Sequence, residues 1–434
     1  MRAINVGIIG LGTVGEGVYR MLTKNGESIE KKVGIPVKIA GVADIDMNRK
    51  RDVGVPEELF TTDAYRLIND PDIHIIVELI GGTEKAGEYL VEASRRGKNI
   101  VTANKALLAE MGDSVIGEVE KEAVEIGFEA SVAGGIPVIK ALRESLAGNS
   151  VIELFGIING TSNYILTRMT RESLEFPFVL EEAQKLGLAE ADPTLDVDGI
   201  DSAHKLAILI CLTTGKYPDF NDVYVEGIRE ITPLDLKFAG EFGYEIKLLA
   251  IAKKDGERIE ARVHPTMIPK GHLLSTVAGA YNAVYVTGDF VGPVLFFGSG
   301  AGMDPTASAV VGDIIDIGRN MRAGSKKRIP FSGYEKDGGK IEVKDVNEVV
   351  SEFYLRFIVI DKPGVLSKIS GILGENNISI SSVIQKVRKM EEGVPIVILT
   401  HEAMERDLKR ALQEIDELDV VLDKTKLIRI ESNL

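Results

Sequence analysis

Residues 4–15 read INVGIIGLGTVG, and this stretch decides the fold of the first part of the chain. A run of Ile and Val leads directly into glycines at positions 10, 12 and 15, which match the pattern GxGxxG. The pattern is specific only where it follows a strand and opens a helix, and both are predicted here. Gly10 would permit the tight turn, Gly12 would let backbone approach a pyrophosphate, and Gly15 would let the helix pack on the strand. The stretch therefore predicts a dinucleotide-binding loop at a helix N-terminus.

The residues after the second predicted strand bear on the choice of dinucleotide. Asp44 ends that strand, where an acidic residue binds the ribose 2′-hydroxyl in this fold. It comes later than usual after the glycines, and we expect residues 25–36 to form a loop inserted before the strand. The basic residues that follow could pair with a 2′-phosphate instead: Arg49, Lys50 and Arg51. Asp44 favours NAD and the basic residues favour NADP, so the sequence leaves both cofactors open.

Short apolar runs alternate with helical stretches through the first third of the chain. The clearest of these runs are rich in Ile and Val and apolar on both faces: residues 4–9, 37–45, 73–80 and 99–103. Such runs are typical of a parallel sheet that helices cover on each side. We therefore predict an α/β Rossmann-type, doubly wound parallel sheet for residues 1–135, completed by a helix near residues 300–320.

The rest of the chain changes character three times. Residues 136–320 mix strand-like and helical runs without a βαβ rhythm, which predicts an α+β substrate-binding and dimerisation domain. Residues 321–350 are polar with clustered Gly and Lys, and we expect them to form a linker. Residues 351–434 then follow the order βαββαβ, which is typical of a ferredoxin-like domain.

Composition and charge exclude several classes of protein. The 434 residues carry a formal net charge of −15, whereas a nucleic-acid binder needs a basic face. No stretch approaches the roughly 20 apolar residues of a membrane span, and the start runs into a strand without room for a signal peptide. Cys211 is the only cysteine, which excludes disulfides within the chain. We therefore expect a cytoplasmic protein that binds neither nucleic acid nor membranes.

Two segments carry candidate catalytic groups. TANK, residues 102–105, closes a strand at the edge of the sheet where doubly wound folds bind ligands, so Lys105 could reach a substrate. Residues 187–205, GLAEADPTLDVDGIDSAHK, place Asp201 and Lys205 four residues apart, on one face of a helix. The same segment crowds carboxylates that repel one another unless a cation, water or a substrate ammonium offsets them: Glu190, Asp192, Asp196, Asp198 and Asp201. An amino-acid substrate would supply that ammonium group.

These motifs together resemble a known family. GLGTVG, TANK, EASVAGGIP, INGTSNYIL, GLAEADPTLDVDGIDSAHK and GSGAGMDPTASAVVGD, in this order, are similar to homoserine dehydrogenase over residues 3–320. Residues 353–385 resemble an ACT domain, an amino-acid-sensing module, and no segment resembles an aspartate kinase. The resemblance implies a monofunctional enzyme (EC 1.1.1.3) that interconverts L-homoserine and L-aspartate 4-semialdehyde with NAD or NADP. That reaction belongs to threonine, isoleucine and methionine biosynthesis.

The resemblance also implies roles for single residues. Lys205 matches the proton-donating lysine and Lys105 a second lysine near nicotinamide and substrate, although which of the two donates the proton stays open. The positions that match carboxylates holding the substrate are Glu190, Asp201 and Asp196. The matching cofactor contacts are Gly10, Gly12, Thr13, Val14, Gly15, Asp44, Arg49, Thr83, Lys105, Gly187 and Gly302.

Residues 129–136, EASVAGGI, resemble the family's monovalent-cation loop. The implied ligands of Na⁺ or K⁺ are the Glu129 carboxylate and the backbone carbonyls of Val132, Gly134 and Ile136. All four are hard oxygen donors, as an alkali cation requires. The alternative is a glycine-bearing strand exit that holds no ion.

The terminal domain carries a candidate effector site. Pro-Gly at residues 363–364 makes a tight turn before a helix whose first amides can receive a carboxylate. Gly364 and Asn377 are the candidate effector contacts, and the implied effector is threonine. Other ACT domains bind other amino acids or serve only subunit contact. The family usually dimerises through its middle domain, which implies a homodimer or a dimer of dimers.

The residues are also compatible with two other functions. One is a dehydrogenase that acts on a different small amino-acid aldehyde or amine. The other is a sensor that binds cofactor and amino acid but has lost catalysis, against which the retained Lys105, Lys205 and Glu190 argue. A cofactor-dependent absorbance change with homoserine would discriminate between these functions.

Overall fold

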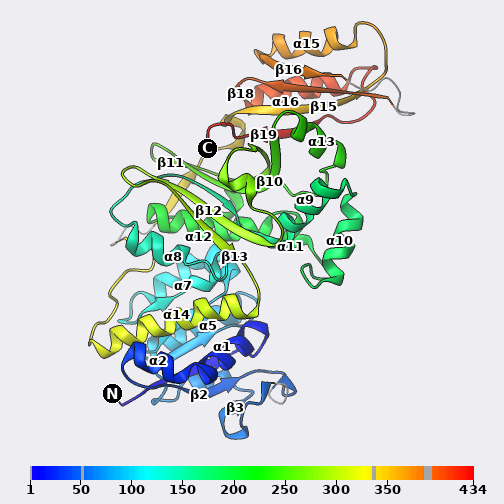
Figure 1. The fold of residues 1–434 in the computed structure, drawn as a ribbon. Coiled ribbons are helices and arrows are strands. Elements are labelled where there is room, and N and C mark those ends of the chain that lie inside the picture. The colour runs from blue at the N-terminus through cyan, green and yellow to red at the C-terminus, as the bar shows by residue number, and fades with distance from the viewer. Residues whose placement is uncertain (1, 50–52, 335–338, 386–392) are drawn as a thin grey trace. The chain divides into compact units, whose positions relative to one another are not determined.

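The structure is a computed structural model that describes residues 2–49, 53–334, 339–385 and 393–434. The chain divides into two compact units, each built from separate segments. Unit 1 comprises Met1–Gly160, Asp201–Val223 and Tyr281–Glu342, and unit 2 comprises Thr161–Ile200, Tyr224–Ala280 and Val343–Leu434. Figure 1 labels the elements of both units, which are described in turn below.

Unit 1 contains the predicted doubly wound sheet. Within the described residues its six parallel strands have the order β3-β2-β1-β4-β5-β6. The strands are β1 (Ile4–Ile9), β2 (Val37–Ala43), β3 (Phe60–Thr61), β4 (Ile75–Glu78), β5 (Asn99–Thr102) and β6 (Ile126–Gly127). The strand order reverses between β1 and β4, so ligands are expected at the carboxyl ends of these two strands.

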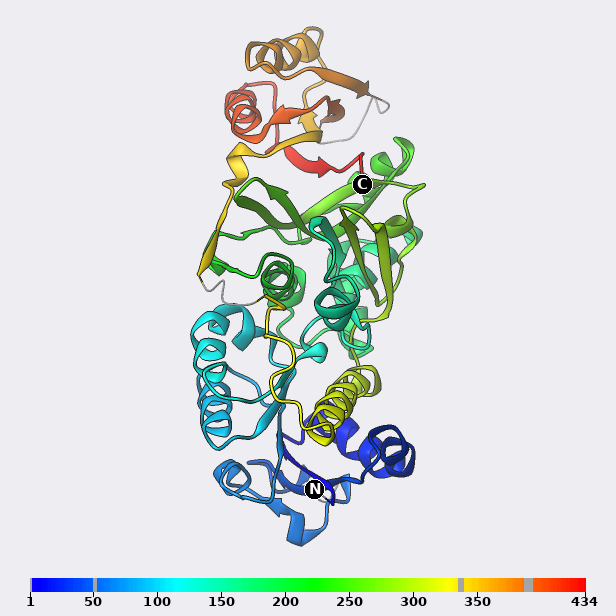
Figure 2. The ribbon, with the colours of Figure 1, turned by 90° about the vertical axis from the view of Figure 1, so that its left-hand side faces the viewer.

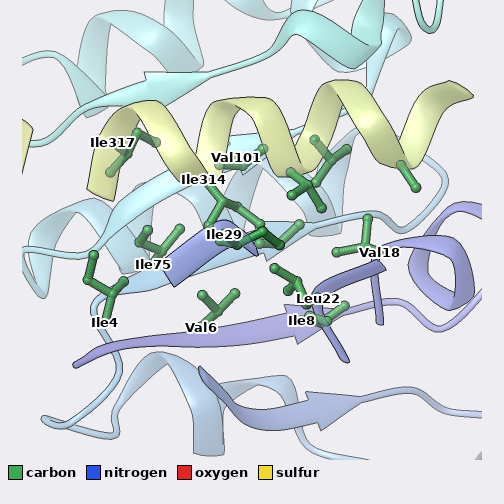
Figure 3. Close-up of a cluster of buried hydrophobic side chains, with 14 of the residues drawn as sticks. Ile4, Val6, Ile8, Val18, Leu22, Ile29, Ile75, Val101, Ile314 and Ile317 are labelled. Carbon is green, nitrogen blue, oxygen red and sulfur yellow. The ribbon is translucent and has the colours of Figure 1, made fainter. Parts of the chain in front are cut away.

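Successive side chains of the strands point to opposite faces of the sheet, and each face packs against a layer of helices. Ile4, Val6 and Ile8 of β1 pack with α1 (Thr13–Lys24), α2 (Gly26–Val33) and α14 (Met303–Arg322), as Figure 3 shows. Ile9 faces the opposite core. The helices that line this second core are α4 (Ala64–Ile68), α5 (Glu84–Arg95), α6 (Lys105–Glu110) and α7 (Gly112–Val119). Figures 1 and 2 show α14, close to the predicted residues 300–320, beside α1.

The prediction of a loop at residues 25–36 was wrong. Gly26–Val33 forms α2, and Gly34 ends it in a left-handed conformation with φ of 89°. Ile29 and Val33 lie four residues apart on one face of this helix and are buried in the core. The helix is short and strongly charged, and its stability therefore comes from this tertiary packing rather than from local propensity.

Unit 1 also holds an antiparallel sheet and a buried helix. Strands β7 (Val151–Ile157), β12 (Tyr281–Gly288) and β13 (Gly292–Ser299) pair as β7-β12-β13. After the cation loop the chain forms α8 (Val138–Lys140) and continues as a π-helical turn at Ala141–Ser145. Helix α12 (Ile200–Thr214) enters unit 1 at Asp201, and its side chains from Asp201 to Leu212 are all buried.

In unit 2, the terminal residues continue a sheet that begins elsewhere in the chain. The hairpin of β10 (Tyr244–Asp255) and β11 (Arg258–Pro269) is extended in the order β10-β11-β19-β15-β17-β16. The terminal strands are β15 (Val350–Val359), β16 (Ile380–Ile384), β17 (Val394–Thr400) and β19 (Lys426–Ile430), with helices α15 (Val365–Glu375) and α16 (Glu405–Asp416). This order confirms the predicted βαββαβ fold, and we refer to residues 350–430 as the terminal module.

The prediction of a linker at residues 321–350 needs a correction. Lys340–Val343 forms β14, which pairs in parallel with β8 (Tyr217–Pro218). Val346–Glu348 then forms a short 3-10 helix. Residues 335–338 of the predicted linker lie outside the described residues. Residues 340–348 of this segment are therefore structured by backbone hydrogen bonds.

Four further helices of the described residues lie in unit 2, and the first of them starts at its boundary with unit 1. They are α9 (Gly160–Glu172), α10 (Phe176–Lys185), α11 (Thr194–Val197) and α13 (Pro233–Glu241). Among the helices of the described residues, none combines the length and the apolar character needed to cross a lipid bilayer.

Candidate active site

The glycine loop has the geometry of a phosphate cradle. Gly10 has φ of 100°, and a Cβ there would lie 2.7 Å from the carbonyl oxygen of Leu79. A Cβ on Gly15 would lie 2.0 Å from the carbonyl oxygen of Gly10, so the helix approaches the strand as closely as backbone permits. Gly12 is the N-cap of α1, and around it the space that a Cβ would occupy is open apart from Arg49 at 3.6 Å.

Helix α1 begins at Thr13, and no described side chain caps its first turn. The amides of Thr13 and Val14 therefore stand at a helix N-terminus, where an anion is stabilised by the helix dipole and by unpaired N–H groups. The open space at Gly12 and these amides fit the pyrophosphate of a dinucleotide. The predicted cofactor loop is thus assembled as a local structure of residues 10–15.

Both predicted recognition groups for the ribose lie against this loop. The Asp44 carboxylate accepts hydrogen bonds from the amides of Leu11 at 2.5 Å and Asp46 at 2.8 Å. The Arg49 guanidinium donates to the Leu11 carbonyl oxygen at 3.3 Å. The other two basic residues of this cluster, Lys50 and Arg51, lie outside the described residues. A carboxylate and a cation therefore both border the cofactor loop.

A buried carboxylate that sequence reasoning missed fixes the carboxyl ends of β4 and β5. Glu78 is fully buried, and it accepts hydrogen bonds from the Thr102 hydroxyl at 2.6 Å and the Ile80 amide at 2.8 Å. Burial raises the pKa of Glu78 to about 7, against the effect of these hydrogen bonds. Its sequence signal is a single acidic residue that closes the apolar strand IIVE. The predicted cofactor contact Thr83 follows as the N-cap of α5, at the same edge of the sheet.

The candidate catalytic lysines meet on one carboxylate. Asp201 Oδ2 lies 2.6 Å from Lys205 Nζ, and Asp201 Oδ1 lies 2.8 Å from Lys105 Nζ. The predicted spacing of four residues on α12 brings the first pair together, whereas Lys105 comes from the start of α6. Burial alone would raise the pKa of Asp201, but the ammonium groups of Lys205 and Lys105 outweigh it and hold that pKa well below its usual range.

Two residues directly after β7 complete this cluster. The Ile158 carbonyl oxygen accepts a hydrogen bond from Lys205 Nζ at 2.7 Å, and Asn159 Nδ2 donates to Asp201 Oδ2 at 2.9 Å. The motif INGTSNYIL (158–166) follows β7, and the sequence pattern alone does not indicate which of its polar residues faces α12. Lys205 is largely buried and Lys105 is 40% exposed, so the second lysine is the more accessible to solvent.

The other predicted substrate residues belong to unit 2. Gly187 follows α10 with φ of 71°, and the exposed Glu190 comes three residues later. Asp196 lies in α11, where its carbonyl oxygen accepts a hydrogen bond from the Ser162 hydroxyl at 2.8 Å. Since the lysine cluster belongs to unit 1, the participation of Glu190, Asp196 and Gly187 in one site with it stays a prediction.

The predicted cation loop is sharply turned and buried. Ala133 and Gly134 have φ of 56° and 53°, and a Cβ on Gly134 would lie 2.5 Å from the Gly300 carbonyl oxygen. The Glu129 carboxylate accepts hydrogen bonds from the amides of Ile139 at 2.8 Å and Lys140 at 2.9 Å. Burial raises the pKa of Glu129, which an adjacent cation would counteract.

The donor set fits an alkali cation in its chemistry. The buried carboxylate of Glu129 and the carbonyls of Val132, Gly134 and Ile136 offer hard oxygens, although the Ile136 carbonyl also accepts from the Val138 amide at 2.8 Å. Asp313, which accepts a hydrogen bond from the Glu129 amide at 2.9 Å, adds a second buried carboxylate. Sequence reasoning missed Asp313, because nothing in the pattern of α14 distinguishes it from a surface acid.

Three further predicted residues lie at turns with left-handed backbone. Gly302 has φ of 113° as the N-cap of α14, and Gly364 has φ of 90° as the N-cap of α15. Asn377, with φ of 59°, is exposed just before β16. Its neighbour Asn376 is buried instead and accepts a hydrogen bond from Arg410 Nε at 2.6 Å. The α15 N-terminus and Asn377 both belong to the terminal module.

Three family models match successive parts of the chain. The family described as homoserine dehydrogenase matches residues 137–315, and its NAD-binding domain matches residues 10–129. The ACT domain family matches residues 353–420. These three matches together cover most of the chain.

Full-length relatives extend the match to both ends. Homoserine dehydrogenase of Neisseria gonorrhoeae is 44% identical over 100% of this chain and 99% of its own. The crystal structure of a homoserine dehydrogenase from Thiobacillus denitrificans, 43% identical, superposes with a TM-score of 0.93 over 100% of this chain and 99% of that one. A hyperthermophilic archaeal homoserine dehydrogenase in complex with NADPH is 27% identical and covers 73% of this chain and 97% of its own, with a TM-score of 0.62. The chain therefore belongs to the homoserine dehydrogenase family: it is an oxidoreductase (EC 1.1.1.3) of amino-acid biosynthesis with an NAD(P)-binding domain and a C-terminal ACT domain.

Proposed function

We propose that Lys205, Asp201 and Lys105 form the catalytic centre that interconverts L-homoserine and L-aspartate 4-semialdehyde. The observation that carries this proposal is the contact of both ammonium groups with one buried carboxylate, at 2.6 Å and 2.8 Å. When bound, the nicotinamide supplies a hydride to the aldehyde carbon or accepts it back. The chain must supply the proton for the oxygen that becomes the alcohol.

Lys205 Nζ donates this proton as negative charge develops on the aldehyde oxygen. A lysine suits the step because it both transfers a proton and stabilises the developing alkoxide. Asp201 stays ionised across the working pH range and orients the two ammonium groups, and Asn159 fixes its rotamer through the 2.9 Å hydrogen bond. Lys105, the more exposed of the two lysines, faces the substrate and the cofactor. Glu190 and Asp196 bind the substrate's ammonium group, which orients the chain for hydride transfer.

The test replaces one lysine at a time without changing its length. We expect Lys205→Met to lower kcat by about 10²- to 10⁴-fold, the usual contribution of general acid–base catalysis, with little change in cofactor affinity. Initial rates with homoserine and fluorescence titration of the cofactor measure the two quantities. Lys185→Met is the control, since Lys185 is exposed on α10 and pairs with Glu181 of the same helix. Near-normal turnover of Lys205→Met, or a larger loss in Lys105→Met, would reassign the proton donor.

The cofactor is proposed to be NADP in preference to NAD. Asp44 already receives two backbone amides, which makes it part of the loop's own structure. Arg49 reaches the same loop and borders the open space at Gly12, so its guanidinium can pair with a 2′-phosphate. The NADPH bound to the archaeal relative is consistent with this preference.

A monovalent cation, Na⁺ or K⁺, is proposed to bind at Glu129 and the carbonyls of Val132, Gly134 and Ile136. Support comes from two buried carboxylates, Glu129 and Asp313, whose pKa values are both raised mainly by burial. A cation beside them would offset the cost of keeping them ionised. Its role here is structural, because it would fix the turn between β6 and α8.

The terminal module is proposed to bind threonine as a feedback effector, with Gly364 and Asn377 among its contacts. The first turn of α15 can receive a carboxylate, and Asn377 supplies an exposed amide nearby in sequence.

The protein is also proposed to form a homodimer, or a dimer of dimers, through the β7-β12-β13 sheet. Tyr281 and Phe297 on this sheet are 51% and 55% exposed and pack together with ring centroids 5.2 Å apart. Such exposed aromatic pairs are typical of subunit interfaces.

A further inference from the structure

The loop at residues 226–229 directly supports the end of the acidic substrate segment. The Ile228 amide donates to the Val197 carbonyl oxygen at 2.8 Å, and Arg229 Nε lies 2.5 Å from Asp198 Oδ1. A Cβ on Gly227 would lie 2.4 Å from the Val197 carbonyl oxygen, so the two backbones touch. This loop therefore sets the position of Val197, the last residue of α11, and of Asp198, which follows it.

The same loop is anchored to the terminal module. The Glu226 amide donates to the Val263 carbonyl oxygen of β11 at 2.8 Å, and its carboxylate accepts a hydrogen bond from Arg429 Nη1 at 3.0 Å. The Arg429 guanidinium also lies over the ring of Tyr224, 4.7 Å from its centroid. Tyr224 belongs to β9 (Tyr224–Val225), the short strand that leads into the loop.

Arg429 is itself held rigidly from the other side. Its Nε and Nη2 donate to the two carboxylate oxygens of Glu405 at 2.8 Å and 2.6 Å, in the planar two-bond geometry that arginine favours. Arg429 is 1% exposed and Glu405 is fully buried at the start of α16. The guanidinium is thus fixed in the terminal module before it meets Glu226.

We propose that Arg429 and Glu226 are positioning residues for the substrate-binding segment. They clamp the 226–229 loop to the terminal module, and through Gly227 and Ile228 the loop holds Val197 and Asp198. The ACT domain is then a structural part of the substrate site as well as a regulatory module. This inference rests on the proposed role of Glu190 and Asp196 in holding the substrate's ammonium group.

Loss of the ion pair between Arg429 and Glu226 should change KM for homoserine more than kcat. The groups that transfer the proton lie on other elements, α6 and α12, whereas the clamp acts on the segment that contains α11. Glu226 is 28% exposed and lines a cleft of about 780 Å³, so water can solvate a neutral side chain placed there. A Glu226→Gln variant is therefore expected to fold and to loosen the loop.

The experiment compares Glu226, which pairs with Arg429 of β19, with a second carboxylate close to the same strand. Glu431, just after β19, pairs with Arg262 at 2.7 Å and Lys253 at 2.6 Å, both from the β10–β11 hairpin. We expect Glu226→Gln to raise KM for homoserine about tenfold, equivalent to about 1.4 kcal/mol, with kcat within threefold and KM for the cofactor unchanged. Glu431→Gln should lower the Tm at least as much as Glu226→Gln does. It should leave KM for homoserine within twofold of the parent value. Equal increases in KM for homoserine in the two variants would contradict the proposal that Arg429 and Glu226 position the substrate-binding segment.

A second pair of variants tests the clamp without changing charge. Gly227→Ala must push the loop away from Val197, whereas Gly271→Ala meets no atom within 4 Å. We expect only Gly227→Ala to raise KM for homoserine, and no difference between the two would contradict the inference. Glu190→Gln separates this inference from the proposed function. If Glu190→Gln raises KM and Glu226→Gln does not, the clamp alone is wrong; if neither raises KM, the substrate segment is misassigned.

Discussion

Among single residues, Asp313 is expected to have the largest effect on how the free energy of unfolding depends on pH. Burial, and then the neighbouring Glu129 carboxylate, raise the pKa of Asp313 to about 7. In the unfolded chain the same carboxyl ionises near pH 4. Between these values the folded state holds a proton that the unfolded state has lost, so the free energy of unfolding falls as pH rises from about 4 to about 7, by on the order of 4 kcal/mol.

Asp313→Asn should remove this pH dependence. An amide oxygen can still accept the hydrogen bond from the Glu129 amide, so the variant is expected to match the parent at pH 4 and to exceed its stability at pH 8. Urea unfolding at both pH values, in a buffer free of Na⁺ and K⁺, measures the difference. Asp316→Asn on the same helix is the control, because Asp316 pairs with Lys140 at 3.2 Å near the surface. An unchanged pH slope in Asp313→Asn would show that the carboxyl is not buried as described.

Arg49 carries the prediction about cofactor choice. Arg49→Ala should raise KM for NADP⁺ about tenfold and change KM for NAD⁺ much less, since only the first has a 2′-phosphate for the guanidinium to bind. Initial rates with each cofactor at saturating homoserine give the ratio. Arg20→Ala, on the exposed face of α1, is the control. Equal changes for both cofactors would leave Asp44 as the group that selects the ribose.

The sequence predicted single residues well where the chain itself sets their spacing. Asp201 and Lys205 meet because four residues of helix separate them, and the glycine loop is local to residues 10–15. Glu78, Asn159 and Asp313 were missed for the opposite reason. Each contributes through a partner that is distant in sequence, and periodicity in one chain segment carries no information about which distant group it will face.

At the scale of elements, the turn before α15 and the turn before β16 define the candidate effector site. Asn377 has φ of 59°, a conformation that glycine adopts without strain. Asn377→Gly therefore removes the side chain and keeps the backbone. We expect this variant, in the full chain, to retain basal activity and to need at least about tenfold more threonine for half inhibition, as loss of a hydrogen bond to a charged ligand implies.

The control for this experiment is another left-handed residue. Ser173 has φ of 54° and is exposed after α9, so Ser173→Gly makes the same backbone change elsewhere in unit 2. Its threonine response should equal that of the parent. If Asn377→Gly also responds like the parent, Asn377 does not contact the effector, and inhibition absent from both would mean that the domain binds another amino acid or none.

Prediction of elements failed mainly where tertiary packing decides between helix and loop. Strands β1, β2, β4 and β5 and the βαββαβ order were predictable because their apolar runs are long and regular, whereas the two-residue strands β3 and β6 were not predicted. Residues 26–33 form a helix only because Ile29 and Val33 find a core between β1 and α14. In the same way, residues 340–343 become a strand only because β8 offers them a partner.

At the scale of the whole molecule, the terminal module is less separate than its sequence indicates. Its own core and its βαββαβ order mark it as an independent domain. Yet β19 pairs with β11, and its buried Arg429 binds Glu226 outside the module. Neither contact is visible in the sequence, because parallel pairing of two distant strands leaves no local pattern. Removal of residues 350–434 would therefore expose β11 and leave Glu226 without its arginine, and truncation is a poor test of regulation alone.

The remaining prediction concerns assembly. The sheet β7-β12-β13 exposes Phe297 on its edge strand, whereas isolated soluble sheets protect such edges with charge or cover. If this face is the subunit interface, Phe297→Lys buries a charge in an apolar contact and should weaken dimerisation at least about a hundredfold. Light scattering coupled to size exclusion, across a dilution series, measures the dissociation constant. Phe178→Lys is the control, because Phe178 is 58% exposed on α10, outside this sheet. A monomer produced by Phe178→Lys and a dimer retained by Phe297→Lys would move the interface to unit 2.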